Sequence, residues 1–226
     1  MSHADTGMRV AGAWLAIASV LLGFVLIGHG PINPDLAQQM QAIASGVTLW
    51  VVVHWAAAAA LSLFVVASLI VLTAGSRLTE RWWTLSAWAV VAVGALWTMT
   101  TAVAEATTVA DAVAANDMAR FAVWWAFAEG KANGFMFLCL AVAVIAGNET
   151  LSRQQVTPTW ASLVGVVAGL GAFVGWPLGM WFGIGLGSLV WVASSFVMAL
   201  WTLWFGLGLA RAENSVSKAR SASFSA

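Results

Sequence analysis

The stretch from Arg120 to Gly147, RFAVWWAFAEGKANGFMFLCLAVAVIAG, decides the fold class. A helix needs roughly 20 predominantly apolar residues to cross a bilayer. This stretch is longer than that and predominantly apolar. Glu129, Lys131 and Asn133 nevertheless lie inside it. Each ionisable side chain costs roughly 2.5–3.5 kcal/mol at membrane depth on insertion scales. The stretch therefore predicts a membrane-spanning helix whose polar residues serve structure or function.

The composition of the whole chain supports a membrane protein. Of its 226 residues, 62% are hydrophobic and 8% are charged, whereas soluble domains average about a quarter charged residues. We therefore expect an integral membrane protein. We expect the lipid bilayer that holds it to be a prokaryotic cytoplasmic membrane. The formal net charge of zero gives no indication of a nucleic-acid partner. Cys139 is the only cysteine, which excludes an intrachain disulfide and cysteine-built metal sites.

Apolar segments recur along the chain and predict an all-α fold, a polytopic bundle of six transmembrane helices. We place the segments near residues 9–29, 47–74, 84–110, 120–147, 159–178 and 183–210. Residues 1–210 would then form one transmembrane domain. Residues 211–226, rich in Ser and Ala with scattered charge, predict a disordered cytoplasmic tail.

The arginines and lysines predict the orientation of the bundle. Arg120 is the one basic residue that the outer loops carry if the N-terminus is cytoplasmic. The inner segments then hold Arg9, Arg77, Arg81, Arg153, Arg211, Lys218 and Arg220. Because basic residues gather on the cytoplasmic side, we expect both termini to be cytoplasmic.

The first outer loop carries a helix signal. Asn33 and Pro34 suit a helix cap and a first helical position, and Leu36, Met40 and Ile43 follow at helical spacing. The pattern predicts a short amphipathic helix on the outer surface. A plain surface connection is the alternative.

Polar residues occupy the outer half of three predicted spans. His54 lies about 10 Å below the outer end of the second span, counted by helix rise. The third span carries a polar stripe at steps of three and four: Thr98, Thr101, Glu105 and Thr108. Such steps put side chains on one face of a helix. We therefore expect His54 and the stripe to meet inside the bundle.

The fourth span presents its polar residues on two sides. Glu129 and Asn133 are four residues apart and share a face, whereas Lys131 points to another side. Lys131 therefore needs a partner on a neighbouring helix. Glu105 is the first candidate for that partner and Asp111 is the second.

Three interpretations of these residues remain open. In the first, they form a structural network in which Lys131 pairs with Glu105. In the second, they line a site that binds or relays a small cation, a proton or a polar ligand. The candidate ligand-binding residues of this site are His54, Thr101, Glu105, Glu129, Lys131 and Asn133. In the third, the site holds a metal ion or a haem, and the protein is a membrane redox protein.

The metal and haem hypotheses use different residues. His54, Glu105 and Glu129 would supply one imidazole and two carboxylates to a metal ion. The missing Glu-x-x-His pair argues against a di-iron carboxylate bundle. For a haem the candidate ligands are His29 and His54, but we expect His29 at the membrane surface and His54 about 10 Å deeper. That difference in depth makes a shared haem awkward.

The function is less determined than the fold. Glycines spaced four apart in the fifth and sixth segments allow helices to approach closely, within the chain or between chains. The protein could therefore also be a homo-oligomer, or a non-catalytic subunit or assembly partner of a membrane complex. No motif identifies a nucleophile, a nucleotide or a specific cofactor. The sequence leaves open whether the protein is an enzyme.

Overall fold

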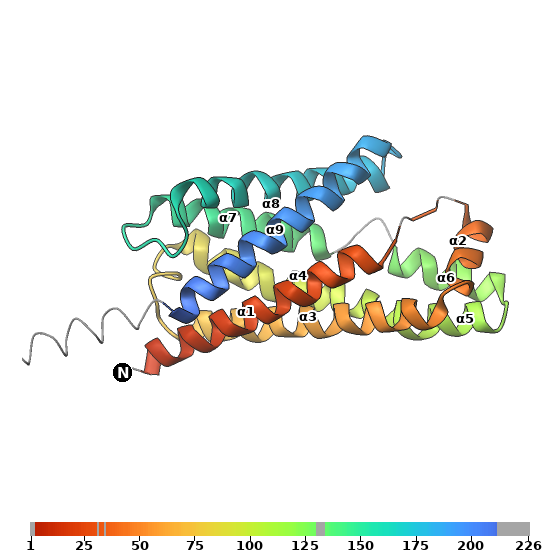
Figure 1. Ribbon diagram of the computed structural model, residues 1–226, viewed down its shortest axis with the longest axis horizontal. Helices are drawn as coiled ribbons and strands as arrows, with labels where there is room; N and C mark the ends of the chain where they lie inside the picture. Colours follow the sequence, from red (N-terminus) through yellow and green to blue (C-terminus); the bar gives the residue numbers. More distant parts are fainter. Residues whose placement is uncertain (1–2, 31, 34, 130–133, 212–226) are drawn as a thin grey trace, which may run out of the picture.

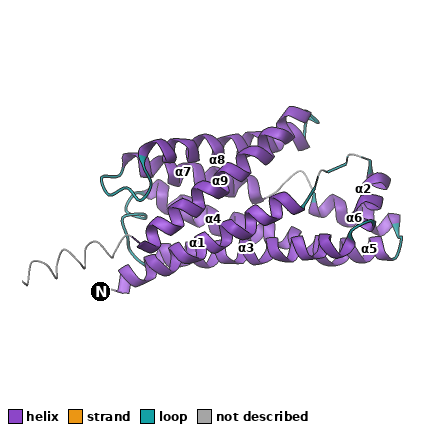
Figure 2. Cartoon of the chain, viewed as in Figure 1, coloured by secondary structure: helices purple, strands orange, loops and turns teal. Residues whose placement is uncertain are grey.

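The computed structural model describes residues 3–30, 32–33, 35–129 and 134–211. The chain folds into helices joined by short loops, with no strand in this described part (Figure 2). In chain order the elements are α1 (His3–Gly28), α2 (Leu36–Ala44), α3 (Val47–Thr73), α4 (Trp82–Ala104), the π-helical segment η1 (Glu105–Val109), α5 (Ala110–Ala114), α6 (Met118–Ala128), α7 (Gly134–Leu151), α8 (Thr159–Met180) and α9 (Gly185–Arg211).

Six helical stretches in the described residues are long and apolar enough to cross a membrane. They are Thr6–Gly28, Val47–Thr73, Trp82–Ala114, Gly134–Leu151, Thr159–Met180 and Gly185–Arg211. The predicted all-α bundle with six transmembrane helices is therefore confirmed, and the protein is an integral membrane protein by the length and composition of its helices.

The spanning helices form a closed ring. Each packs on the next spanning helix along the chain, and α9 closes the ring against α1. A continuous apolar core fills the centre, with Phe64, Leu138 and Phe205 almost fully buried. α3 and α4, which a short turn joins, pack on each other.

Close helix approach depends on glycine at defined positions. A Cβ added to Gly94 of α4 would lie 2.7 Å from the carbonyl oxygen of Gly134 in α7. Gly12 and Gly206 make the same kind of contact between α1 and α9. Other glycines whose added Cβ would meet atoms of neighbouring helices of this chain are Gly165, Gly169, Gly175 and Gly187. These glycines therefore serve packing within the chain.

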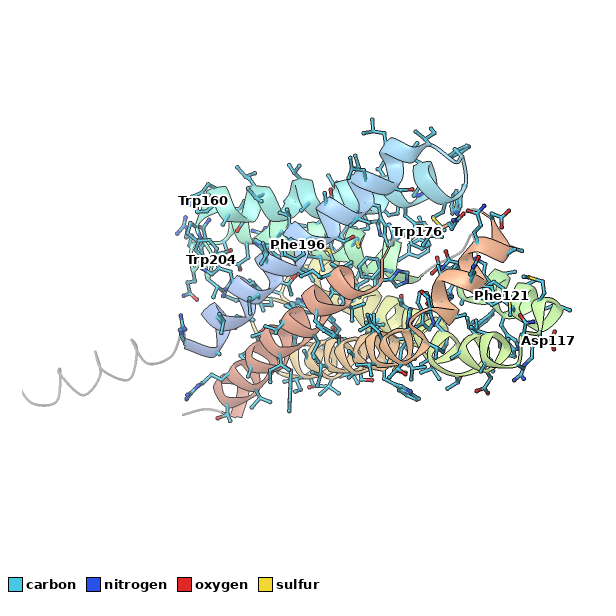
Figure 3. The ribbon with its side chains drawn as sticks, turned by 45° about the vertical axis from the view of Figure 1, so that its right-hand side comes forward. Asp117, Phe121, Trp160, Trp176, Phe196 and Trp204 are labelled. Atoms are coloured by element: carbon cyan, nitrogen blue, oxygen red, sulfur yellow. The ribbon has the colours of Figure 1, made fainter. Side chains whose placement is uncertain are left out.

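A second, smaller core extends one end of the ring. α1 ends short of this extension, which α2, α5, α6 and the start of α3 build (Figure 1). Its interior holds Ile43, Trp50, Val109 and Phe121. Asp117 and Phe121 mark this end, whereas Trp160 and Trp204 lie at the opposite end (Figure 3). We call the extension the cap.

The predicted amphipathic helix is present as α2, with Met40 and Ile43 buried against the cap. Its expected start at Asn33 and Pro34 is wrong. Asp35 caps the helix instead, because its side chain accepts the backbone N–H of Gln38. Asn33 Oδ1 accepts the N–H of Asp35 in turn. Pro34 lies outside the described residues.

The predicted single span over 120–147 is wrong. α6 ends at Ala128, because Glu129 leaves the helical region with φ −96° and ψ 17°. A separate helix, α7, begins at Gly134 and provides the membrane span. Lys131 and Asn133 lie between them, outside the described residues. Splitting the segment makes α6 part of the cap and gives Glu129 its place at the end of a helix.

The end of the bundle opposite the cap is fixed by a buried ion pair. Glu149 of α7 is fully buried, and its Oε1 lies 2.8 Å from Nη1 of Arg77. Its Oε2 accepts the backbone N–H of Val156. The pair joins the α3–α4 turn to α7, and the hydrogen bond from Val156 joins α7 to the following loop. α1 begins and α9 ends at this same end (Figure 1). Its cytoplasmic orientation stays a prediction, and residues 212–226 of the predicted tail lie outside the described residues.

Candidate functional site

Four ionisable side chains converge where the main core meets the cap. His29 follows the last residue of α1, and His54 lies in the second turn of α3. Glu105 opens η1, and Glu129 follows α6. The structure thus brings together the predicted site residues His54, Glu105 and Glu129, and it adds His29.

His54 presents an electron pair to Glu105. Its Nδ1 lies 2.7 Å from the backbone carbonyl oxygen of Trp50, which can only accept, so Nδ1 carries the hydrogen. In the neutral ring, Nε2 then has a lone pair and contacts Oε2 of Glu105 directly. Neither atom has another hydrogen-bond partner among the described residues. Two acceptors in contact repel each other unless a cation or a proton lies between them.

His29 approaches the same carboxylate from α1. Its Nε2 lies 3.8 Å from Oε2 of Glu105 and 3.9 Å from Oε1 of Glu129, while Nδ1 lies 3.2 Å from the carbonyl oxygen of Gly30. The rings of His29 and His54 are 5.1 Å apart between centroids. The expected difference in depth between the two histidines is therefore wrong, because α1 ends level with the interior of α3 rather than with its first residues (Figure 1).

Trp50 contacts three of the four converging residues, namely His29, His54 and Glu105. Its indole lies 4.1 Å from the His54 ring and 5.1 Å from the His29 ring, centroid to centroid. Its Nε1 donates to the backbone carbonyl oxygen of Glu105 at 3.2 Å. Sequence reasoning missed Trp50, although its spacing of four from His54 puts both side chains on one face of α3.

Glu105 is the first residue of the π-helical segment η1. A π-turn inserts one extra residue into a helix and shifts the face on which the following side chains lie, and such insertions are frequent at functional sites. The hydroxyls of Thr107 and Thr108 donate to the carbonyl oxygens of Val103 and Ala104. Backbone oxygens around the insertion are thereby satisfied. Regular helical steps could not predict this shift.

The pKa values of His29 and Glu129, which lie outside the spanning segments, are shifted from their ordinary values. Burial opposes a charged His29 ring, but hydrogen bonding and charge attraction from Glu105, with the charge of Glu129, outweigh it and raise its pKa to about 9. Burial, followed by repulsion from Glu105, raises the pKa of Glu129 to about 8. His29 and Glu129 therefore retain their protons near neutral pH.

The remaining predicted site residues are not brought into this cluster by any contact that the structure describes. The hydroxyl of Thr101 donates to the carbonyl oxygen of Thr98 within α4. Asp111 lies 3.8 Å from Arg120, and both side chains are exposed. Lys131 and Asn133 are outside the described residues, so the pairing of Lys131 with Glu105 stays a prediction.

The donor set suits a metal ion. One donor atom each from His29, His54 and Glu105 lies within 4.8 Å of the other two. Donors bound to one tetrahedral ion at about 2.1 Å lie about 3.4 Å apart, so small side-chain movements would bring all three to an ion. For a haem, by contrast, the Glu105 carboxylate lies against both imidazoles, where an iron shared by His29 and His54 would have to bind. The geometry favours a single ion.

Comparison of the chain with protein-family models, curated proteins and solved structures gave no match.

Proposed function

We propose that this integral membrane protein binds one divalent first-row transition metal ion through His29, His54 and Glu105. The contact between His54 Nε2 and Glu105 Oε2 carries the proposal. Hydrogen bonding of Nδ1 to the Trp50 carbonyl leaves Nε2 as an acceptor beside a carboxylate oxygen. A metal ion would convert this repulsion into two bonds.

The charges of the cluster support a divalent ion. With neutral imidazoles, Glu105 and Glu129 would bring two negative charges into a buried position. A single buried carboxylate is already costly without a counter-charge. A divalent cation balances both carboxylates. In the metal-free protein, protons held by His29 and Glu129 offset this cost, and a divalent ion would take their place.

The kinds of donor atom narrow the choice of ion. Imidazole nitrogen suits Zn²⁺, Fe²⁺, Ni²⁺ and Cu²⁺, whereas sites built from carboxylate oxygens alone suit Mg²⁺ and Ca²⁺. Two imidazoles with one carboxylate therefore favour a transition metal. Both imidazoles also use their second nitrogen on a backbone carbonyl, as metal-binding histidines commonly do.

A proton is the alternative occupant of the same contact. With a proton on Nε2, His54 would be an imidazolium that donates to Glu105, and the cluster would relay protons rather than hold a metal. The two occupants differ in one measurable property, because a proton leaves no metal in the purified protein. Assembly with other chains stays a separate prediction that none of these contacts addresses.

Metal analysis of the full chain, purified in mild detergent, tests the proposal. We would incubate the protein with Zn²⁺, Fe²⁺, Mn²⁺ or Co²⁺, remove unbound ion and measure metal by mass spectrometry. We expect one metal ion per chain. Glu105→Gln should raise the dissociation constant at least about 100-fold, since it replaces an anionic ligand with an amide.

Asp111→Asn is the matched control, because it removes a carboxylate of the same helical stretch whose side chain is exposed. It should retain one metal ion per chain. Wild-type protein that binds none of the four metals would contradict the proposal and leave the proton as the occupant. Equal metal content in Glu105→Gln and wild type would contradict the ligand assignment.

A further inference from the structure

The three proposed ligands do not complete a coordination shell. In the described part of the chain, the group whose donor atoms all lie within 4.8 Å of one another consists of His29, His54 and Glu105. Structural zinc sites have four protein ligands, whereas catalytic sites keep a position for water or substrate. Two histidines and one carboxylate are also the set that leaves open positions on iron.

Glu129 borders the position that these ligands leave. Its Oε1 lies 3.9 Å from Nε2 of His29, so its carboxyl group would lie beside a bound ion without belonging to the three-residue group. Its Oε2 is buried and has no hydrogen-bond partner among the described residues. A buried carboxyl oxygen without a partner is costly. A small ligand on the metal, such as a water molecule, would give this oxygen a donor.

The exposure of the side chains indicates where such a ligand enters. The His29 side chain is 21% exposed, whereas those of His54 and Glu105 are 3% and 6% exposed. The cluster is therefore most open beside His29, which is also the side that Glu129 occupies. A small molecule from solvent would reach the metal there and meet Glu129 on arrival.

We propose that the metal centre keeps one exchangeable coordination position beside Glu129, which takes water or a small anion. This inference rests on the proposed metal binding. Glu129 acts on the bound ligand by hydrogen bonding and does not bind the metal. The centre would then be of the kind that activates a small ligand, rather than of the kind that only holds helices together.

Azide binding to the cobalt-loaded protein tests the inference. Co²⁺ absorbs visible light according to its coordination, so an added ligand changes the spectrum. We expect wild type to bind one Co²⁺ and to show a saturable spectral change with azide. Glu129→Gln should keep one Co²⁺ and bind azide about tenfold more tightly, because the bound cation keeps Glu129 ionised and the replacement removes that negative charge.

Asp111→Asn again provides the control, and its azide affinity should stay within about twofold of wild type because its charge is exposed and screened. A cobalt spectrum that azide leaves unchanged would overturn the inference while leaving metal binding intact. Loss of cobalt from Glu129→Gln, to the extent seen in Glu105→Gln, would show that Glu129 is a ligand and would also overturn it. Wild type that takes up no cobalt would overturn the inference, and uptake of none of the four metals would contradict metal binding as well.

Discussion

The indole Nε1 of Trp50 donates to the backbone carbonyl oxygen of Glu105 at 3.2 Å and thereby joins α3 to the first residue of η1. The carbonyl of Trp50 in turn accepts from His54. Two of the proposed ligands, His54 and Glu105, are thus oriented by one residue that is itself almost fully buried. Residues that hydrogen-bond to metal ligands without binding the metal commonly tune the affinity for the metal.

Replacing Trp50 by Phe tests this relationship. The phenyl ring retains contact with both imidazoles but cannot donate to the backbone carbonyl oxygen of Glu105, so the backbone that carries this carboxylate should lose a fixed contact. We expect the dissociation constant for the metal to rise about tenfold. Competition with a chelator of known affinity measures it. Trp125→Phe is the matched control, because Trp125 packs on Trp50 at 6.0 Å between centroids. An equal effect of both replacements would contradict an orienting role for the indole N–H.

Metal binding should weaken as the pH falls. An ion can bind the His29 imidazole only after its proton leaves, and the pKa of His29 is raised to about 9. As the pH rises toward this pKa, the affinity for the metal should increase by about tenfold per pH unit for each proton displaced. Above this pKa the affinity should level off. Titrations at pH 6, 7 and 8 would measure the slope. Affinity that is independent of pH would show that no proton is displaced.

The ion pair at the other end of the bundle should affect stability and leave the site alone. Glu149→Gln keeps the shape of the side chain but leaves Arg77 without its buried partner. Breaking such a pair costs roughly 3–5 kcal/mol, and the partial exposure of Arg77 favours the lower figure. Thermal unfolding in detergent should shift to lower temperature, while folded protein keeps one metal ion per chain. An unchanged transition would contradict this assignment.

The contact between α4 and α7 gives a steric prediction. Gly94→Ala places a methyl group 2.7 Å from the carbonyl oxygen of Gly134, and crowding of this kind costs about 1–3 kcal/mol. Gly23→Ala is the control, since no atom lies within 4 Å of its added Cβ. It should be neutral or slightly stabilising, because alanine favours a helix. Thermal unfolding of the Gly94→Ala and Gly23→Ala variants in the same detergent tests this prediction. Equal unfolding temperatures would contradict the close approach of α4 and α7.

The spanning helices were predictable because length and apolarity determine which segments cross a membrane. The 120–147 segment was misjudged because apolar content alone does not reveal the helix end at Glu129. Sequence spacing also indicated that His54 and Glu105 lie on inward faces, and they are in contact.

The complete cluster could not be predicted. His29 reaches it because α1 ends level with the interior of α3, and relative helix height is a property of packing rather than of local sequence. The π-helical segment that begins at Glu105, whose carbonyl oxygen accepts from Trp50, departs from a regular helix. Regular helical periodicity carries no signal for either feature.

X-ray absorption at the edge of the bound metal tests the central claim most directly. For protein loaded with Zn²⁺ or Co²⁺ in detergent, the account predicts nitrogen and oxygen neighbours at about 2.0–2.2 Å. It also predicts the outer-shell scattering of two imidazole rings, reduced to one ring in His29→Ala. A shell of oxygen atoms without imidazole scattering, or a spectrum identical in wild type and His29→Ala, would contradict it.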